Sequence, residues 1–111
     1  MRKILILILC LMLCACTDTS KESDIEKIMK ENNYVIIDVR TKEEYDELHV
    51  KDSINIAYDE INSSIDIDKD KIIFVYCKSG GRSSMAYSTL KELGYTVYDL
   101  GGIDKIDLPK E

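Results

Sequence analysis

Residues 71–83 read KIIFVYCKSGGRS, and this stretch decides the fold. The run 71–76 is apolar, β-branched and aromatic, which is typical of a strand covered on both faces of a parallel sheet. Cys77 follows the strand directly, and two glycines come soon after it. A helix is predicted over 83–93, because its apolar residues fall at helical spacing and Gly94 can end it. Strand, loop and helix in this order predict an α/β unit with a thiol at its turn.

Further elements are predicted on both sides of this unit. They are a helix capped by Ser23 or Asp24 and ended by residues 32–33, a strand over 34–39, a brief helix over 41–48 opened by a capping box, a strand over 53–57, one or two helical turns over 58–64, and a strand over 96–100. Because strands alternate with helices, we predict one α/β domain, with a mainly parallel sheet flanked by helices on both faces.

Length and charge limit the classes of function. The chain has 111 residues, of which 45% are hydrophobic and 32% charged, which is the balance of a single globular domain. Its formal net charge is -6, and it would reach -8 if Arg2 and Lys3 were removed with a leader segment. We therefore expect no nucleic-acid partner, because such binding needs a basic face.

The N-terminal residues are predicted to form an export signal. A basic start, Met1-Arg2-Lys3, precedes the apolar run 4–13, which is too short to span a membrane as a helix. The sequence Leu13-Cys14-Ala15-Cys16 resembles the lipobox of bacterial lipoprotein signal peptides, and an ordinary secreted protein is the alternative. We predict a signal peptide over 1–15, a lipidated Cys16 with a tether over 16–23, and a domain over 24–111. The mature protein would then be anchored on the extracytoplasmic face of the membrane.

Cys77 has the surroundings of a reactive thiol. It lies where the carboxyl end of a parallel strand meets the start of a helix, and the N–H groups of that helix start lack intrahelical partners. Gly80 and Gly81 allow the loop to curl around the sulfur, and Lys78 and Arg82 add positive charge. These features favour the thiolate, and they would equally stabilise a persulfide anion. An inert, buried cysteine is the alternative.

This loop resembles the rhodanese active-site loop, Cys-x-x-Gly-x-Arg-Ser. The resemblance extends from about Asn33 to Ile106 and includes the segments 36–40 (IIDVR), 49–56 (HVKDSINI) and 98–102 (YDLGG). Within 49–56, residues 51–53 replace the family's Pro-Gly-Ala, and Ile106 stands where the family usually has Trp. The resemblance implies a rhodanese-like three-layer fold, a catalytic Cys77 that carries sulfur, and a loop that binds the donor anion. The loop residues are Lys78, Ser79, Gly80, Gly81, Arg82 and Ser83.

The other polar residues of these segments are expected to be structural. Asp38, Arg40 and Glu44 are interpreted as a hydrogen-bond and ion-pair set that joins a strand to a helix. His49 is the one histidine, and sulfur transfer needs no general base if the loop already supplies the thiolate. No cluster of cysteines and histidines indicates a metal, and we expect no cofactor.

Three functions are compatible with this reading. The first is a sulfurtransferase that moves sulfur from thiosulfate, a polysulfide or a similar donor to a thiol or cyanide. The second is a cysteine phosphatase or arsenate reductase, but those enzymes space Cys and Arg as Cys-x5-Arg, whereas Cys77 and Arg82 give Cys-x4-Arg. The third is a non-catalytic binding or sulfur-relay module that serves a protein acceptor.

Overall fold

The computed structural model describes residues 20–111, with side chains described from Asp24 onward. The chain forms two compact units, which divide after Asn32 and are treated separately. The first contains α2 (Ser20–Glu31), which begins before the predicted cap at Ser23 or Asp24 and ends at the predicted place. The predicted signal peptide over 1–15 and the lipidated Cys16 lie outside the described residues. Among those that are described, no helix is long and apolar enough to cross a membrane.

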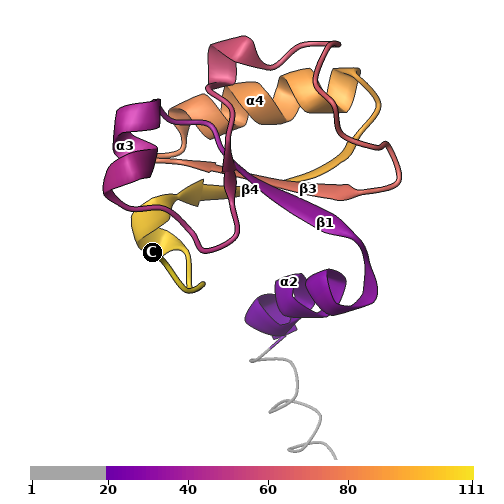
Figure 1. Ribbon diagram of the computed structural model, residues 1–111. Coiled ribbons are helices and arrows are strands. Elements are labelled where there is room, and N and C mark those ends of the chain that lie inside the picture. Colours follow the sequence, from indigo (N-terminus) through magenta and orange to yellow (C-terminus); the bar gives the residue numbers. More distant parts are fainter. Residues whose placement is uncertain (1–19) are drawn as a thin grey trace, which may run out of the picture. The chain divides into compact units, whose positions relative to one another are not determined.

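The second unit is built on a parallel sheet of four strands (Figure 1). These are β1 (Tyr34–Asp38), β2 (Ile54–Asn55), β3 (Ile72–Cys77) and β4 (Thr96–Gly102), in the spatial order β2-β1-β3-β4. Every pairing is parallel, as the sequence predicts. The carboxyl ends of β1, β3 and β4 therefore meet at one edge of the sheet, and Cys77 is the last residue of the central strand β3.

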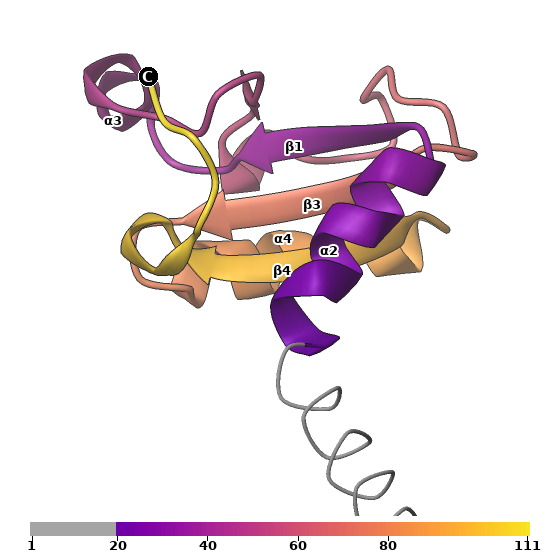
Figure 2. The same cartoon turned by 90° about the horizontal axis from the view of Figure 1, so that it is seen from below.

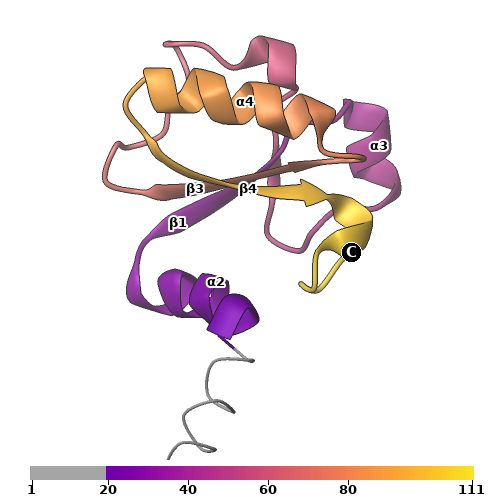
Figure 3. The ribbon, with the colours of Figure 1, turned by 180° about the vertical axis from the view of Figure 1, so that it is seen from behind.

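One face of the sheet is covered by α4 (Gly81–Glu92), which runs along β3 and β4 (Figure 3). Alternate residues of β1, β3 and β4 point to this helix because successive side chains of a strand point to opposite faces. The core between sheet and helix consists of Ile37, Val39, Ile73, Val75, Cys77, Ala86, Leu90 and Val97. The side chain of Cys77 thus belongs to the face that packs on α4.

The opposite face carries aromatic and polar side chains, and Figure 2 shows the three long strands from this side. The buried ring of Phe74 packs between Tyr34 and Tyr98, with ring centroids 5.9 Å and 5.5 Å away. Tyr76, on the same face and nearer the carboxyl end of β3, is also fully buried. The two faces of the sheet therefore differ. The face under α4 is apolar, and the opposite face is partly polar near the carboxyl ends of the strands.

Short elements surround the carboxyl edge. They are α3 (Lys42–Glu47), η1 (Tyr58–Glu60) and η2 (Ile103–Lys105). The predicted capping box of α3 is confirmed, with Thr41 and Glu44 bonding each other's backbone N–H groups. The predicted strand 53–57 is wrong in length, because only Ile54 and Asn55 pair with β1.

The start of α4 and the end of β4 also differ from the predicted bounds. α4 begins at Gly81, two residues early, since Gly80 caps it with a φ of +104° rather than with a side chain. β4 continues through both glycines that were expected to end it. A register shift between Val75 and Tyr76 sets Tyr76 opposite Gly101, whose φ is +82°. Glycine permits this irregularity without ending the strand.

Candidate active site

The loop after β3 closes around the sulfur of Cys77. Gly80 turns the backbone so that its N–H donates to Sγ across 2.9 Å. Sγ also lies 3.5 Å from the hydroxyl of the buried Ser83, which itself donates to the Gly80 carbonyl across 3.1 Å. The loop residues Lys78, Ser79 and Gly81 are exposed, whereas Cys77 is 0% exposed. The thiol therefore sits under a thin cover of loop backbone.

These contacts set the acidity of the thiol. Burial alone raises the pKa of Cys77, because a buried thiolate loses its hydration. Hydrogen bonds from the Ser83 side chain and from the backbone N–H groups of Ser83, Gly80 and Ser79 act in the opposite direction and prevail. The pKa of Cys77 is thus lower than its usual value, and backbone amides together with Ser83 stabilise the thiolate.

Arg82 does not direct its terminal nitrogens to the sulfur. Its Nη1 and Nη2 bind the two carboxylate oxygens of Glu44 at 2.7 Å and 3.1 Å. This bond from Arg82 is the main reason that the pKa of Glu44 falls to about 2. Glu44 also raises the pKa of Arg82, to which the nearby Cys77 contributes less. Arg82 was predicted to add positive charge near Cys77; the structure shows in addition that Glu44 pairs with this charge.

The pair also corrects the role predicted for Glu44. Glu44 was expected to join β1 to α3 together with Asp38 and Arg40, but its carboxylate links α3 to the loop after Cys77 instead. Its Oε1 accepts the backbone N–H of Thr41 at 3.1 Å, so the helix start orients the carboxylate. No local sequence signal pairs it with Arg82, which lies 38 residues away.

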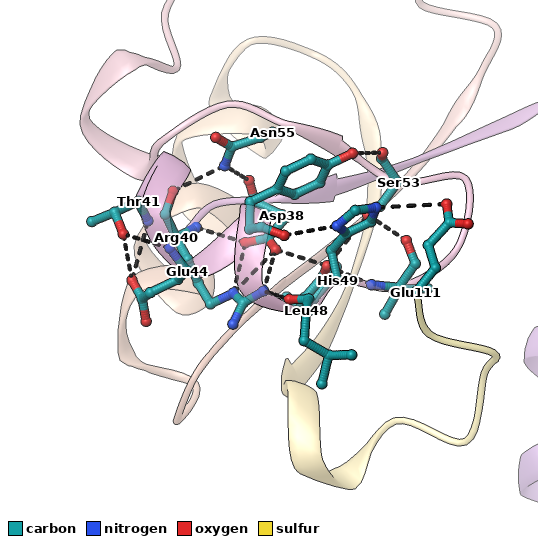
Figure 4. Close-up of polar contacts among 12 residues, drawn as sticks. Asp38, Arg40, Thr41, Glu44, Leu48, His49, Ser53, Asn55 and Glu111 are labelled. Atoms are coloured by element: carbon teal, nitrogen blue, oxygen red, sulfur yellow. Dashed lines mark hydrogen bonds and ion pairs between the residues drawn. The ribbon is translucent and has the colours of Figure 1, made fainter.

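Asp38 and Arg40 form a buried ion pair at the end of β1 (Figure 4). Arg40 Nη2 lies 2.6 Å from Asp38 Oδ2 and 2.5 Å from the carbonyl oxygen of Leu48. The Asn55 side-chain amide donates to the backbone carbonyls of Asp38 and Arg40, each at 3.0 Å. The turn between β1 and α3 is therefore held from three sides, and it in turn positions Glu44.

Tyr76 extends this network beneath the sheet. Its hydroxyl donates to Asp38 Oδ2 at 2.8 Å, accepts the Val50 N–H at 2.9 Å and lies 3.3 Å from Ser53 Oγ. Burial is the main reason that the pKa of Tyr76 rises to about 12; the hydrogen bonds with Ser53 and Val50 lower it, whereas Asp38 raises it, and the hydroxyl stays protonated. The sequence predicts only packing for Tyr76. The neighbouring Asp38 could have been found as a partner from its place opposite Tyr76 in adjacent strands.

His49 contacts the C-terminal segment. Its ring stacks on Tyr45 with centroids 3.8 Å apart, and Nδ1 lies 2.7 Å from the Tyr45 carbonyl oxygen. The backbones of His49 and Glu111 exchange two hydrogen bonds of 2.9 Å and 2.8 Å, and His49 Nε2 lies 3.6 Å from the Glu111 carboxylate (Figure 4). Both ring nitrogens thus face structural partners.

Gly102 is a further residue of the site that the sequence did not single out. It pairs with Cys77 in the β3–β4 register. A Cβ atom at this position would lie 2.5 Å from the Lys78 carbonyl oxygen and 3.4 Å from Ser79 Cα. The end of β4 therefore supports the Cys77 loop by direct backbone contact, which only glycine permits.

Known proteins are similar to this chain in sequence and in fold. The profile of the rhodanese-like domain matches residues 22–107. The thiosulfate sulfurtransferase PspE of Escherichia coli is 41% identical over 78 residues, which are 67% of this chain and 75% of PspE. The putative sulfur carrier protein YrkF of Bacillus subtilis is 30% identical over 79 residues, 70% of this chain and 43% of that protein.

A solved structure described as a rhodanese with anions, from E. coli, has a TM-score of 0.63 and 37% identity. The match covers 70% of this chain and 96% of the other. The comparison confirms the predicted α/β rhodanese-like fold, and the sequence relationship extends through the Cys77 loop and the strands that hold it. The chain therefore belongs to the rhodanese-like domain family.

Proposed function

We propose that this protein is a sulfurtransferase in which Cys77 carries sulfane sulfur as a persulfide. The observation that carries the proposal is the cradle around Sγ, in which the Gly80 N–H lies at 2.9 Å and Ser83 at 3.5 Å. The lowered pKa of Cys77 supplies the nucleophile. The names of the relatives, a thiosulfate sulfurtransferase and a putative sulfur carrier, support the same chemistry.

The proposed transfer has two balanced steps. With thiosulfate as donor, the Cys77 thiolate attacks the outer sulfur and a new S–S bond forms. The S–S bond of thiosulfate breaks, and sulfite leaves with the bonding electron pair. The enzyme then holds Cys77–S–S⁻. In the second step, an acceptor thiolate or cyanide attacks the terminal sulfur, and the bonding pair returns to Cys77 as thiolate. The sulfur atom moves from one S–S bond to another, so neither step needs an added oxidant or reductant.

The backbone donors serve both states of the protein. Amide N–H groups that stabilise a thiolate also stabilise the negative terminal sulfur of a persulfide, because both are anions of similar size. Cys77 is 0% exposed, so a donor reaches Sγ only when the loop moves aside. Gly80 and Gly81 have no atoms within 4 Å of the position a Cβ would take, so no other segment packs against that side of either residue.

Mass spectrometry of the intact protein after incubation with a sulfane-sulfur donor tests the proposal. We expect a gain of one sulfur atom, its loss on addition of cyanide, and no gain in the Cys77→Ser variant. Ser83→Ala is a useful companion, because it should slow loading without abolishing it. A wild-type protein that gains no sulfur from thiosulfate, polysulfide or an organic persulfide would refute the assignment.

The same assay separates turnover from relay. A sulfurtransferase should release thiocyanate or a new persulfide repeatedly from one enzyme molecule. A relay module would load once and then discharge only to a specific protein acceptor. Repeated release to small thiols therefore supports catalysis, and loading without it favours relay.

Loop length is proposed to exclude phosphatase chemistry. Inserting one glycine between Gly80 and Gly81 would restore the Cys-x5-Arg spacing and widen the ring by one N–H. We expect the insertion to weaken sulfur loading and to improve binding of a tetrahedral oxyanion such as arsenate or an aryl phosphate. Unchanged sulfur loading in the insertion variant would show that loop size is not the determinant.

We further propose that lipidation of Cys16 anchors the protein to the extracytoplasmic face of the membrane. The support is the lipobox-like sequence and the polar segment after it; the tether was predicted over 16–23, but α2 already begins at Ser20. Cell fractionation with the Cys16→Ser variant tests it. The wild type should sediment with membranes and Cys16→Ser should not, whereas identical fractionation of the two would contradict the anchor.

A further inference from the structure

The charges around Cys77 are paired rather than free. Asp38 neutralises Arg40 at 2.6 Å, and Glu44 neutralises Arg82 through two bonds of 2.7 Å and 3.1 Å. The pKa of Glu44, about 2, keeps its carboxylate ionised throughout the physiological range. The two ion pairs together have no net charge, so Glu44 offsets much of the positive charge that Arg82 presents to Cys77, and the hydrogen bonds to the sulfur come from backbone N–H groups and Ser83.

Sulfane-sulfur donors differ in the charge they bring to such a site. Thiosulfate is a dianion, and sulfite leaves with two negative charges close to the breaking S–S bond. An organic persulfide, or an organic polysulfide with one anionic end, brings one charge to the reacting end, and its leaving group carries one charge: a thiolate from the persulfide and a shorter polysulfide anion from the polysulfide. The dianion therefore depends more on a nearby cation, and the negative net charge of the whole protein opposes it further.

We propose that Glu44 determines the class of donor by keeping Arg82 occupied, so that the site prefers an organic persulfide or polysulfide to thiosulfate. This inference rests on the proposed sulfurtransferase function and narrows its substrate. Glu44 is a positioning residue in this scheme, since it acts on the donor through Arg82. Its capping-box contact to Thr41 holds the carboxylate in place, so Arg82 is matched by a fixed partner.

The preferred reaction is balanced with no added oxidant or reductant. The Cys77 thiolate attacks the terminal sulfur of the donor persulfide, R–S–S⁻. The Cys77 S–S bond forms, the donor S–S bond breaks, and the electron pair leaves on R–S⁻. One negative charge thus remains on the enzyme persulfide and one on the departing thiolate, as before the reaction.

The test uses Glu44→Gln with Glu43→Gln as its matched control. Glutamine keeps the size of the side chain and a carbonyl oxygen for Thr41, but it removes the charge that holds Arg82. Glu43 is the adjacent residue of α3, is exposed, and takes part in none of the ion pairs found within residues 20–111. Both variants change the net charge of the protein equally. Only Glu44→Gln removes the ion pair with Arg82, so a difference between the two variants reports the release of Arg82.

The readout is the second-order rate of Cys77 persulfide formation, measured by mass spectrometry with thiosulfate and with cysteine persulfide. Glu44→Gln should raise the thiosulfate rate relative to the persulfide rate by about fivefold to tenfold, which is the effect of freeing one partly exposed charge. Glu43→Gln should leave this ratio within about twofold, since surface charges are strongly screened. Glu44→Met offers the same test if the glutamine variant melts too low to assay.

The outcomes separate the two proposals. An unchanged donor ratio in a folded Glu44 variant, or an equal loss with both donors, would overturn the selectivity role while leaving the sulfurtransferase intact. A wild type that prefers thiosulfate would overturn it as well. A wild type that loads from neither donor would overturn the proposed function, and this inference with it.

Discussion

The contact between Gly102 and the catalytic loop permits a quantitative prediction. Replacing Gly102 by alanine would place a Cβ 2.5 Å from the Lys78 carbonyl oxygen, although such contacts essentially never fall below 3.0 Å. The loop or the end of β4 must therefore move by at least about 0.5 Å, an overpacking that costs about 1–3 kcal/mol of unfolding free energy. The φ of Gly102 is -85°, so backbone strain adds nothing.

The displaced atoms belong to the loop that supplies the Sγ donors. A misplacement of about 1 Å can cost about a hundredfold in rate, so a shift of half that size should lower persulfide formation about tenfold. We also expect the pKa of Cys77 to move back toward its ordinary value, because the 2.9 Å bond from Gly80 is disturbed. For Gly102→Ala, stopped-flow loading measures the rate of persulfide formation, and urea unfolding measures the loss of stability.

Gly101→Ala is the matched control. Gly101 has a φ of +82° with no atoms near the position of a Cβ, so alanine there meets strain without collision. This variant should lose about 1 kcal/mol of stability but keep its loading rate. If Gly102→Ala folded and loaded sulfur at the wild-type rate, or if the two variants slowed loading equally, the contact with Lys78 would not position the loop.

Three further predictions concern acidity and the buried network. Ser83→Ala should raise the pH midpoint of Cys77 alkylation by iodoacetamide, since Ser83 helps to lower that pKa; a midpoint at or below that of wild type would contradict this. Tyr76→Phe should lower the free energy of unfolding in urea by about 1–3 kcal/mol, because it leaves the buried Val50 N–H without its acceptor. A smaller loss would contradict a stabilising role for the Tyr76 hydroxyl. The pKa of Glu44 is lowered to about 2, so its contribution to stability is present above the unfolded value of 4.5 and is lost as the pH falls toward 2; Glu44→Gln should therefore flatten the acid limb of a stability-against-pH curve.

Local patterns were enough to predict the unit around Cys77. The apolar run 71–76, the glycines after it and the helix that follows are read from neighbouring residues, and the capping box at Thr41 needs only a spacing of three. Element boundaries were less predictable. The strand expected over 53–57 shrinks to Ile54–Asn55, because its length depends on how many residues reach β1, and not on its own composition.

Side-chain partners across the chain were not predictable from spacing. Arg82 meets Glu44, and Tyr76 meets Asp38, each across 38 residues. These pairs arise because parallel strands bring their carboxyl ends to one edge, where register and loop geometry choose among several possible partners. A single sequence shows which residues are charged but not which of them pair. It therefore predicts a positive charge from Arg82 near the sulfur of Cys77, but not the pairing of Arg82 with Glu44.

The sequence by itself determined the strand-loop-helix unit, the place of Cys77 at its turn and the resemblance of this loop to the rhodanese loop, because each depends on residues close together in the chain. Only the tertiary structure decided that Glu44 pairs with Arg82, that Ser83 joins the backbone amides in lowering the pKa of Cys77, and that Gly102 contacts the loop. Burial and charge pairing set these properties, and both exist only once distant segments have packed together.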